Sequence, residues 1–322
     1  MPDPAFSVII PSYNRANLLD RALRSVKSQT FQDFEVVIAD DGSKDNTPDL
    51  IEQWRANFGD RLRTLWLDHG GAAMARNAGI AASKGHAVAF LDSDDEWLPE
   101  HLEVCHTALQ TNPEAGMIFT DHIIQSDTRI RTQAPVSGSL RELVRNIILR
   151  RVVIATPSVV VRREVFEKVG VFTKELNGTE DWECWVRIAV EYPVVQAPSA
   201  AVVIHQHPDN FSRDPVALER QLQAAVNAIC KLKILGYCGK EEVEARAYLD
   251  MAEFYAQKAF RGRAMLRLGM AAIRSGRIVF SRDFHRVIAR VALPLAVYRL
   301  IRKRVSKGVA IQEDYQLGAV DS

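Results

Sequence analysis

The N-terminal part of the chain repeats one pattern, a short β-branched run followed by a polar loop and an amphipathic segment. The runs at Ser7–Ile10, Glu35–Ala39 and Thr64–Leu67 have the composition of strands, and each precedes a segment with helical periodicity. The second helix is expected to have Thr47 as its N-cap and Pro48 as its first residue, and to run through Trp54. Strands that alternate with helices at this spacing form a mostly parallel sheet covered on both faces. The pattern therefore predicts an α/β domain.

A fourth strand is predicted at Val88–Leu91, an apolar run typical of a strand buried on both faces. It ends in Asp92, Asp94 and Asp95. Ligands of open α/β sheets bind at the carboxyl ends of the strands, so these carboxylates should lie at the mouth of a crevice. A divalent cation such as Mg²⁺ or Mn²⁺ would relieve the repulsion between them. The alternative is an acidic turn that caps the helix expected to begin near Pro99.

The strand ends together predict a nucleotide site. Tyr13, Asp41 and the pair Asp92 and Asp94 follow three different predicted strands and should share one edge of the sheet. No G-x-G-x-x-G motif follows the first strand, and no P-loop motif occurs in the sequence. Phosphates must therefore be held in another way, for which a metal ion is the simplest solution. Further strands are predicted at Met117–Thr120 and Ser158–Val161, and the polar stretch 126–139 is predicted to be a loop.

Charge divides the 322 residues into two parts. Residues 1–215 carry 22 Lys and Arg against 30 Asp and Glu, whereas residues 216–322 carry 19 against 10. We therefore expect two domains, 1–215 and 216–322. The N-terminus has no basic region before its apolar run, and no segment supplies the about 18 apolar residues that a membrane span requires. A cytoplasmic protein is expected, with the option of a peripheral position at the inner face of the membrane.

The second part is predicted to be entirely helical, with helices at 218–235, 241–260, 264–275 and 284–305. The last of these mixes apolar residues with six Arg and Lys, including Arg286, Arg290 and Arg299. Such a basic amphipathic helix is typical of an element that binds an anionic membrane surface. A helical bundle with a solvated cationic face is the alternative. Nucleic acid is not an expected partner, because the aromatic residues do not interleave with the basic ones as a stacking platform requires.

Five stretches in this order and spacing resemble glycosyltransferase family 2, whose members have the GT-A fold. They are S-V-I-I-P-S-Y-N-R (Ser7–Arg15), I-A-D-D-G-S-K-D-N-T (Ile38–Thr47), A-R-N-A-G-I (Ala75–Ile80), F-L-D-S-D-D-E-W (Phe90–Trp97) and T-E-D-W-E-C-W-V-R (Thr179–Arg187). The resemblance covers about the first two thirds of the chain. It implies a GT-A domain with a mostly parallel central sheet, to which the C-terminal helical part is added.

The resemblance also implies roles for individual residues. Those implied in nucleotide-sugar binding are Pro11, Tyr13, Asp41, Arg76 and Asp92. Those implied in metal binding are Asp92, Asp94 and His207. Asp181 matches the catalytic base of the family, although a carboxylate at a helix start can equally serve the helix dipole alone. The pattern departs from the family at His205, where arginine is usual, and at Thr173, where aspartate is common.

The implied activity is metal-dependent, inverting transfer of a hexose or N-acetylhexosamine from a nucleotide-diphosphate sugar. A UDP-sugar is the expected donor, and the acceptor is a hydroxyl of a glycan or of a lipid-linked glycan, in bacterial cell-surface polysaccharide synthesis. Two alternatives stay open. A nucleotidyltransferase would use similar metal ligands and release pyrophosphate, and a non-catalytic protein that binds sugar nucleotides or glycans would show affinity without turnover.

Overall fold

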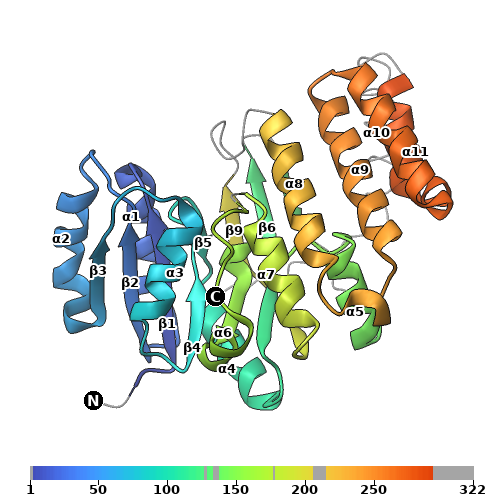
Figure 1. Cartoon of the computed structure of the whole chain (residues 1–322). Coiled ribbons are helices and arrows are strands. Elements are labelled where there is room, and N and C mark those ends of the chain that lie inside the picture. The colour runs from blue at the N-terminus through green and yellow to red at the C-terminus, as the bar shows by residue number, and fades with distance from the viewer. Residues whose placement is uncertain (1–2, 127–128, 133–137, 177, 206–214, 293–322) are drawn as a thin grey trace, which may run out of the picture. The chain divides into compact units, whose positions relative to one another are not determined.

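The computed structural model describes residues 3–126, 129–132, 138–176, 178–205 and 215–292 (Figure 1). The chain forms two compact units, Met1–Lys240 and Glu241–Ser322. The division after Lys240 lies later than the expected one after residue 215. Helix α8 (Pro215–Ile229) falls in the first unit because it packs against α7 (Glu180–Ala189).

Within the described residues, nine strands form one mixed sheet in the order β3-β2-β1-β4-β8-β6-β9-β5, with β7 paired to β6. Their bounds are β1 Phe6–Ser12, β2 Phe34–Asp40, β3 Leu62–Trp66, β4 Ala87–Phe90, β5 Glu96–Trp97, β6 Met117–Ser126, β7 Arg129–Thr132, β8 Val159–Arg162 and β9 Val194–His205. The first four strands in this order are parallel, as the sequence predicts. The other half is mixed, because β8 runs antiparallel to both β4 and β6, whereas β6 and β9 are parallel.

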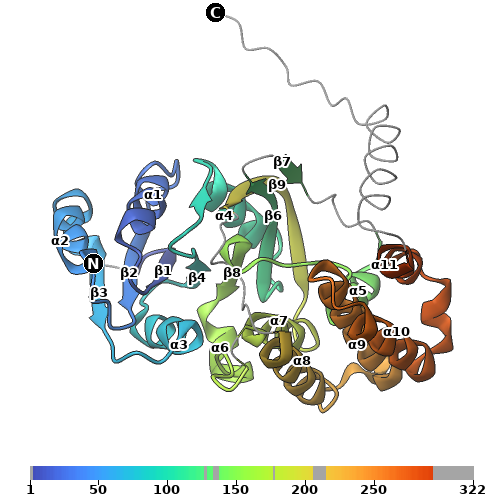
Figure 2. The same ribbon diagram turned by 90° about the horizontal axis from the view of Figure 1, so that it is seen from above.

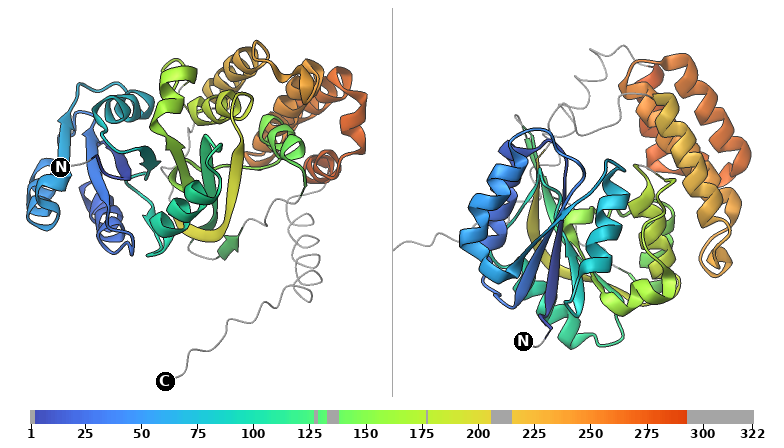
Figure 3. Two further views of the ribbon diagram at one scale, coloured as in Figure 1. Left: turned by 90° about the horizontal axis from the view of Figure 1, so that it is seen from below. Right: turned by 60° about the vertical axis from the view of Figure 1, so that its left-hand side comes forward.

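Helices cover the sheet of the first unit on both faces (Figure 2). One face carries α1 (Ala16–Lys27), α2 (Thr47–Phe58) and α4 (His101–Thr111). The other carries α3 (Ala72–Ala82), α6 (Arg163–Val169) and α7. Helix α5 (Leu140–Ile148) contacts α7, and the twist of the parallel strands is visible in the right-hand view of Figure 3.

Burial on both faces explains the apolar composition of the parallel strands. Successive side chains of a strand point to opposite faces. In β1, Val8 and Ile10 join the large core cluster that includes residues of α1 and α2. Ile9 faces α3, where a Cβ on Gly79 would come within 2.5 Å of the Ile9 Cγ2 atom. Glycine at that position lets α3 approach the sheet closely and places Arg76, one turn earlier, beside the strand ends.

Part of the predicted loop at 126–139 is a strand. Residues Arg129–Thr132 form β7, which pairs antiparallel with the end of β6 from Ile123 to Ser126. Among the described strands, β7 pairs with β6 and lies off the main strand order.

The second unit contains α9 (Lys240–Gln257), α10 (Arg261–Arg274), a 3₁₀ turn at Gly276–Phe280 and α11 (Arg282–Ala292). These helices match the predicted ones within a few residues. The predicted continuation of the last helix to Val305 lies outside the described residues. In the described part of the chain, no helix is both long enough and apolar enough to cross a bilayer.

Candidate active site

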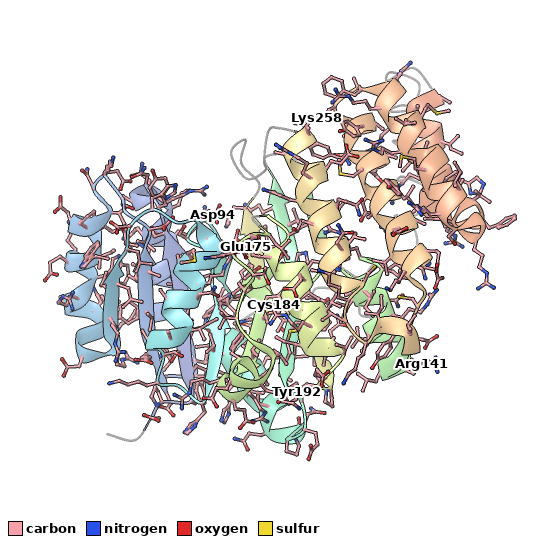
Figure 4. The ribbon with its side chains drawn as sticks, in the orientation of Figure 1. Asp94, Arg141, Glu175, Cys184, Tyr192 and Lys258 are labelled. Atoms are coloured by element: carbon pink, nitrogen blue, oxygen red, sulfur yellow. The ribbon has the colours of Figure 1, made fainter. Side chains whose placement is uncertain are left out.

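A pocket of about 340 Å³ lies at the carboxyl ends of the parallel strands. The parallel register puts Ser12 of β1 opposite Asp40 of β2, so the loops after these strands open on the same edge. Figure 4 shows Asp94 at this edge and Tyr192 at the opposite one. Six residues predicted to bind nucleotide sugar or metal line this one pocket: Pro11, Tyr13, Asp41, Arg76, Asp92 and Asp94.

Asp41 organises the loop that follows β3. Its carboxylate is buried and accepts hydrogen bonds from the backbone N–H groups of Gly70, at 2.8 Å, and Gly71, at 2.9 Å. Gly71 adopts φ +90°, a conformation that a residue with a Cβ rarely takes. The Asp41 Oδ2 atom also lies 2.8 Å from Nδ1 of His69. The loop is therefore held in one shape from the end of the neighbouring strand.

The His69 ring stacks on the ring of Tyr13, with 4.1 Å between centroids and 20° between planes. Both side chains are exposed, which leaves an aromatic surface at the rim of the pocket. Sequence reasoning missed His69. The only feature of the sequence that could have pointed to His69 is its position in the loop that follows β3.

Arg76 of α3 links the loop after β4 to the start of α7. Its guanidinium is buried, with Nη2 2.7 Å from Asp92 Oδ1 and Nη1 3.0 Å from Glu180 Oε1. These carboxylates raise the pKa of Arg76 above its ordinary value despite the burial, so it stays a cation. Glu180 lies 104 residues further along the chain, at the start of α7, and the sequence analysis did not single it out. A residue predicted to bind the nucleotide sugar is thus linked to the residue before the predicted base.

The acidic triplet is divided among different contacts. Asp94 Oδ2 lies 2.5 Å from Nη1 of Arg15, and Asp92 pairs with Arg76. Asp95 is buried and accepts a hydrogen bond from the His205 backbone N–H at 2.9 Å. Burial, with the negative charges of Asp92 and Asp94, raises the pKa of Asp95 to about 8. The triplet is therefore more than an acidic cap on α4, because two of its members face the pocket.

Asp92 and Asp94 fit a site in which a divalent cation is held partly by the protein and partly by the phosphates of a bound ligand. No group of three or more His, Cys, Asp or Glu side chains arranged to hold a metal occurs within the described ranges. Magnesium is commonly bound by only one or two carboxylates together with substrate phosphates. Asp92 and Asp94 supply such a pair at the pocket wall. His207, the third predicted metal ligand, lies outside the described residues.

Asp181 is the second residue of α7, and the helix N-cap is Thr179. It is partly exposed, and its Oδ1 accepts the backbone N–H of Trp182 at 2.6 Å. Burial and the neighbouring Glu180 raise the pKa of Asp181 above its ordinary value, while this hydrogen bond and the charges of Arg150 and Arg76 oppose the shift. Asp181 does not line this pocket, but its neighbour Glu180 pairs with Arg76, which does.

Comparison with known proteins decides the family. The family model described as glycosyl transferase family 2 matches residues 7–170, about half of the chain. The chain belongs to glycosyltransferase family 2. An uncharacterized glycosyltransferase of Nostoc is 39% identical over 168 residues, 51% of this chain and 52% of that relative. The putative teichuronic acid biosynthesis glycosyltransferase TuaG of Bacillus subtilis is 40% identical over 101 residues, 31% of this chain and 40% of TuaG. The chain thus spans about half or less of the length of these two relatives.

Solved structures confirm the predicted fold of this glycosyltransferase. Staphylococcus aureus TarS 1–349, in complex with UDP-GlcNAc, has a TM-score of 0.62 at 18% identity, over 100% of this chain and 95% of that one. Mannosyltransferase PcManGT from Pyrobaculum calidifontis, in complex with GDP-Man and Mn²⁺, has a TM-score of 0.61 at 22% identity, over 95% and 85%. The GT-A prediction with an added helical region is correct.

Replacing Glu180 by glutamine is expected to destabilise this glycosyltransferase by about 1–3 kcal/mol, because the buried Arg76 keeps an acceptor oxygen but loses one of its two carboxylate charges. Urea unfolding of the purified protein measures the difference. The control is Glu175→Gln, at an exposed glutamate that pairs only loosely with Lys174, at 4.0 Å. Equal stability of the two variants would show that the Arg76–Glu180 pair does not hold α7 against the nucleotide site.

Proposed function

We propose that this glycosyltransferase transfers a sugar from a nucleotide-diphosphate sugar, with UDP as the nucleotide, to a hydroxyl of a glycan or lipid-linked acceptor with inversion. The observation that carries the proposal is that six residues predicted to bind donor or metal line one pocket, which Arg76 and Glu180 connect to Asp181. Complexes of the structural neighbours with UDP-GlcNAc and with GDP-Man and Mn²⁺ support a nucleotide sugar as the donor.

The part of the pocket near Asp41 and Tyr13 suits a pyrimidine base. A carboxylate offers about four lone-pair sites. Three polar hydrogen-bonding groups, the backbone N–H groups of Gly70 and Gly71 and the His69 ring nitrogen, already approach Asp41. The remaining site can accept the imide N–H of uracil, while the base stacks on the Tyr13 ring. Three preorganised contacts hold the Asp41 carboxylate in place, so little further ordering is needed when the base binds.

Asp92 and Asp94 are proposed to hold the divalent cation together with the diphosphate. A bound Mn²⁺ or Mg²⁺ would neutralise the charge that develops on the departing diphosphate. Arg76 adds a fixed positive charge beside Asp92. Arg15 pairs with Asp94 at the pocket wall and would exchange that partner for the donor phosphates.

Asp181 is proposed to accept the proton of the acceptor hydroxyl while its oxygen attacks the anomeric carbon. The bond from that carbon to the diphosphate oxygen breaks on the opposite face, so an α-linked donor gives a β-linked product. Burial and Glu180 raise the pKa of Asp181, which makes its carboxylate a stronger base than a solvated aspartate. The proposed setting is synthesis of a bacterial cell-surface polysaccharide, which the similarity to TuaG supports, and we place it on the cytoplasmic side.

The donor is tested by thermal shift with UDP-GlcNAc, UDP-glucose and GDP-mannose, each with and without Mn²⁺. A UDP-sugar is expected to raise the Tm only when metal is present, since binding to the folded state alone stabilises it. Released nucleoside diphosphate then identifies a transferase, whereas pyrophosphate from a nucleoside triphosphate identifies a nucleotidyltransferase. Affinity without turnover across a range of glycan acceptors would favour the non-catalytic alternative. Stabilisation by none of the sugars would contradict the donor assignment.

A further inference from the structure

The outward face of α10 is apolar. Its buried face consists of Ala264, Leu268 and Ala271. At 3.6 residues per turn, the opposite face carries Gly262, Leu266, Gly269 and Ile273. Leu266 is 59% exposed and Ile273 is 84% exposed. We call this row, together with Met265 and the exposed Phe280 of the following turn, the α10 strip. A helix that is apolar on both sides is unusual on a surface that faces only water.

The α10 strip is bordered by an excess of positive charge, although one of the basic residues, Arg274, pairs with Glu244 of α9, with 3.2 Å between Nε and Oε2. The sequence from Lys258 to Arg282 contains seven basic residues and no Asp or Glu. These residues are Lys258, Arg261, Arg263, Arg267, Arg274, Arg277 and Arg282. Figure 4 shows Lys258 at the end of α9, just before α10 begins. Arg263 and Arg267 lie along one flank of the helix, so the charged ends of long side chains border an apolar centre.

Helix α11, which the sequence pointed to as the membrane element, is arranged differently in its described part. Three of its apolar residues, Phe284, Val287 and Val291, are buried, and Ile288 is 39% exposed. Two of its arginines are paired with α9: Arg286 Nη2 lies 2.7 Å and Arg290 Nη1 2.9 Å from the Glu253 carboxylate. Their positive charge is largely balanced within the unit. An exposed apolar face and an excess of positive charge occur together on α10 instead.

We propose that the α10 strip docks on the surface of an anionic lipid bilayer. Leucine, isoleucine and phenylalanine side chains would enter the headgroup boundary, and the bordering arginines and lysine would attract the lipid phosphates. A second copy bound through the same strip would bring two sets of seven positive charges together, which like-charge repulsion disfavours. Residues 293–307 carry five further basic residues and no acid, so that segment also lacks a complementary charge. The proposal is independent of the donor and of catalysis.

The test is sedimentation of the full chain with vesicles of phosphatidylcholine alone and with vesicles that also contain phosphatidylglycerol. The first variant, Leu266→Ser with Ile273→Ser, removes apolar contact at exposed positions. A second variant, Arg277→Gln with Arg282→Gln, removes charge. Leu235→Ser is the matched control, because Leu235 is 77% exposed but lies in the first unit. Circular dichroism and Tm verify that every variant is folded, and light scattering gives its mass.

The unaltered chain is expected to bind only the vesicles with phosphatidylglycerol, and less strongly at high salt. The partition coefficient of the Leu266/Ile273 variant into these vesicles should fall by at least about tenfold. The Arg277/Arg282 variant should also bind them more weakly, whereas Leu235→Ser should bind as the unaltered chain does. Binding by the Leu266/Ile273 variant at full strength would overturn the proposal, as would equal binding to both vesicle types or to neither. A dimer that becomes a monomer in this variant, without vesicle binding, would assign the strip to a second copy instead.

Discussion

Asp181→Asn is expected to lower kcat by about 10²–10⁴-fold, the usual contribution of a general base. Asparagine has nearly the same shape and can still accept the Trp182 N–H, so α7 should begin as before. Because Asp181 does not line the nucleotide pocket, the KM for the donor should change little. The measurement is steady-state release of nucleoside diphosphate with the donor and acceptor that the thermal-shift screen and acceptor trials identify. Glu175→Gln, at an exposed acid, is the control and should keep full activity.

The pH profile gives a second readout for Asp181. A general base works only when deprotonated, so kcat/KM should fall as the pH falls through the pKa of Asp181. Burial and Glu180 raise that pKa, so this acid limb should lie above the ordinary range of an aspartate. The limb should be absent from the residual activity of Asp181→Asn. A loss in kcat of less than about tenfold, with the limb retained, would restrict Asp181 to a structural role at the helix start.

Asp94→Ala is expected to remove the metal-dependent part of donor binding. The apparent affinity for UDP in the presence of Mn²⁺ should fall by at least about 100-fold, because outer-sphere partners of metal ligands alone are worth 10–100-fold. Isothermal titration with UDP, with and without Mn²⁺, measures the change. The metal-free protein should keep its stability within about 1 kcal/mol, since Arg15 in the Arg15–Asp94 pair is 29% exposed.

The matched control for Asp94 is Asp60→Asn, an exposed aspartate in the 3₁₀ turn Gly59–Arg61. It should bind UDP and Mn²⁺ as the unaltered chain does. If Asp94→Ala retained the full effect of Mn²⁺ on UDP affinity, the cation would have to be held by Asp92 and other groups. If Mn²⁺ had no effect on either protein, the glycosyltransferase would hold the diphosphate through Arg76 and Arg15 without a metal.

Local sequence was sufficient for most elements of the first unit and for placing most of the predicted site residues at one edge of the sheet. Strands such as the one predicted at Val88–Leu91 can be recognised in the sequence. Burial on both faces requires an uninterrupted run of apolar residues, and such a run is visible in a short stretch of sequence. Residues that follow parallel strands share an edge whatever the details of packing. For this reason Tyr13, Asp41, Asp92 and Asp94 could be placed together in advance, and they line one pocket.

The tertiary structure decided which distant groups meet. The Arg76–Glu180 pair joins residues 104 positions apart, and the stack of His69 on Tyr13 depends on how one loop bends over another. The hydrophobic periodicity of a segment gives no indication of such long-range contacts. The same holds for charge in the second unit. Helix α11 contains three arginines and one aspartate, and α10 contains four arginines and no acid. Glu253 pairs with Arg286 and Arg290 of α11, and Glu244 pairs with Arg274 of α10, but the other arginines of α10 lie beside an exposed apolar strip. Composition counts charges, whereas their effect depends on which neighbours the fold supplies.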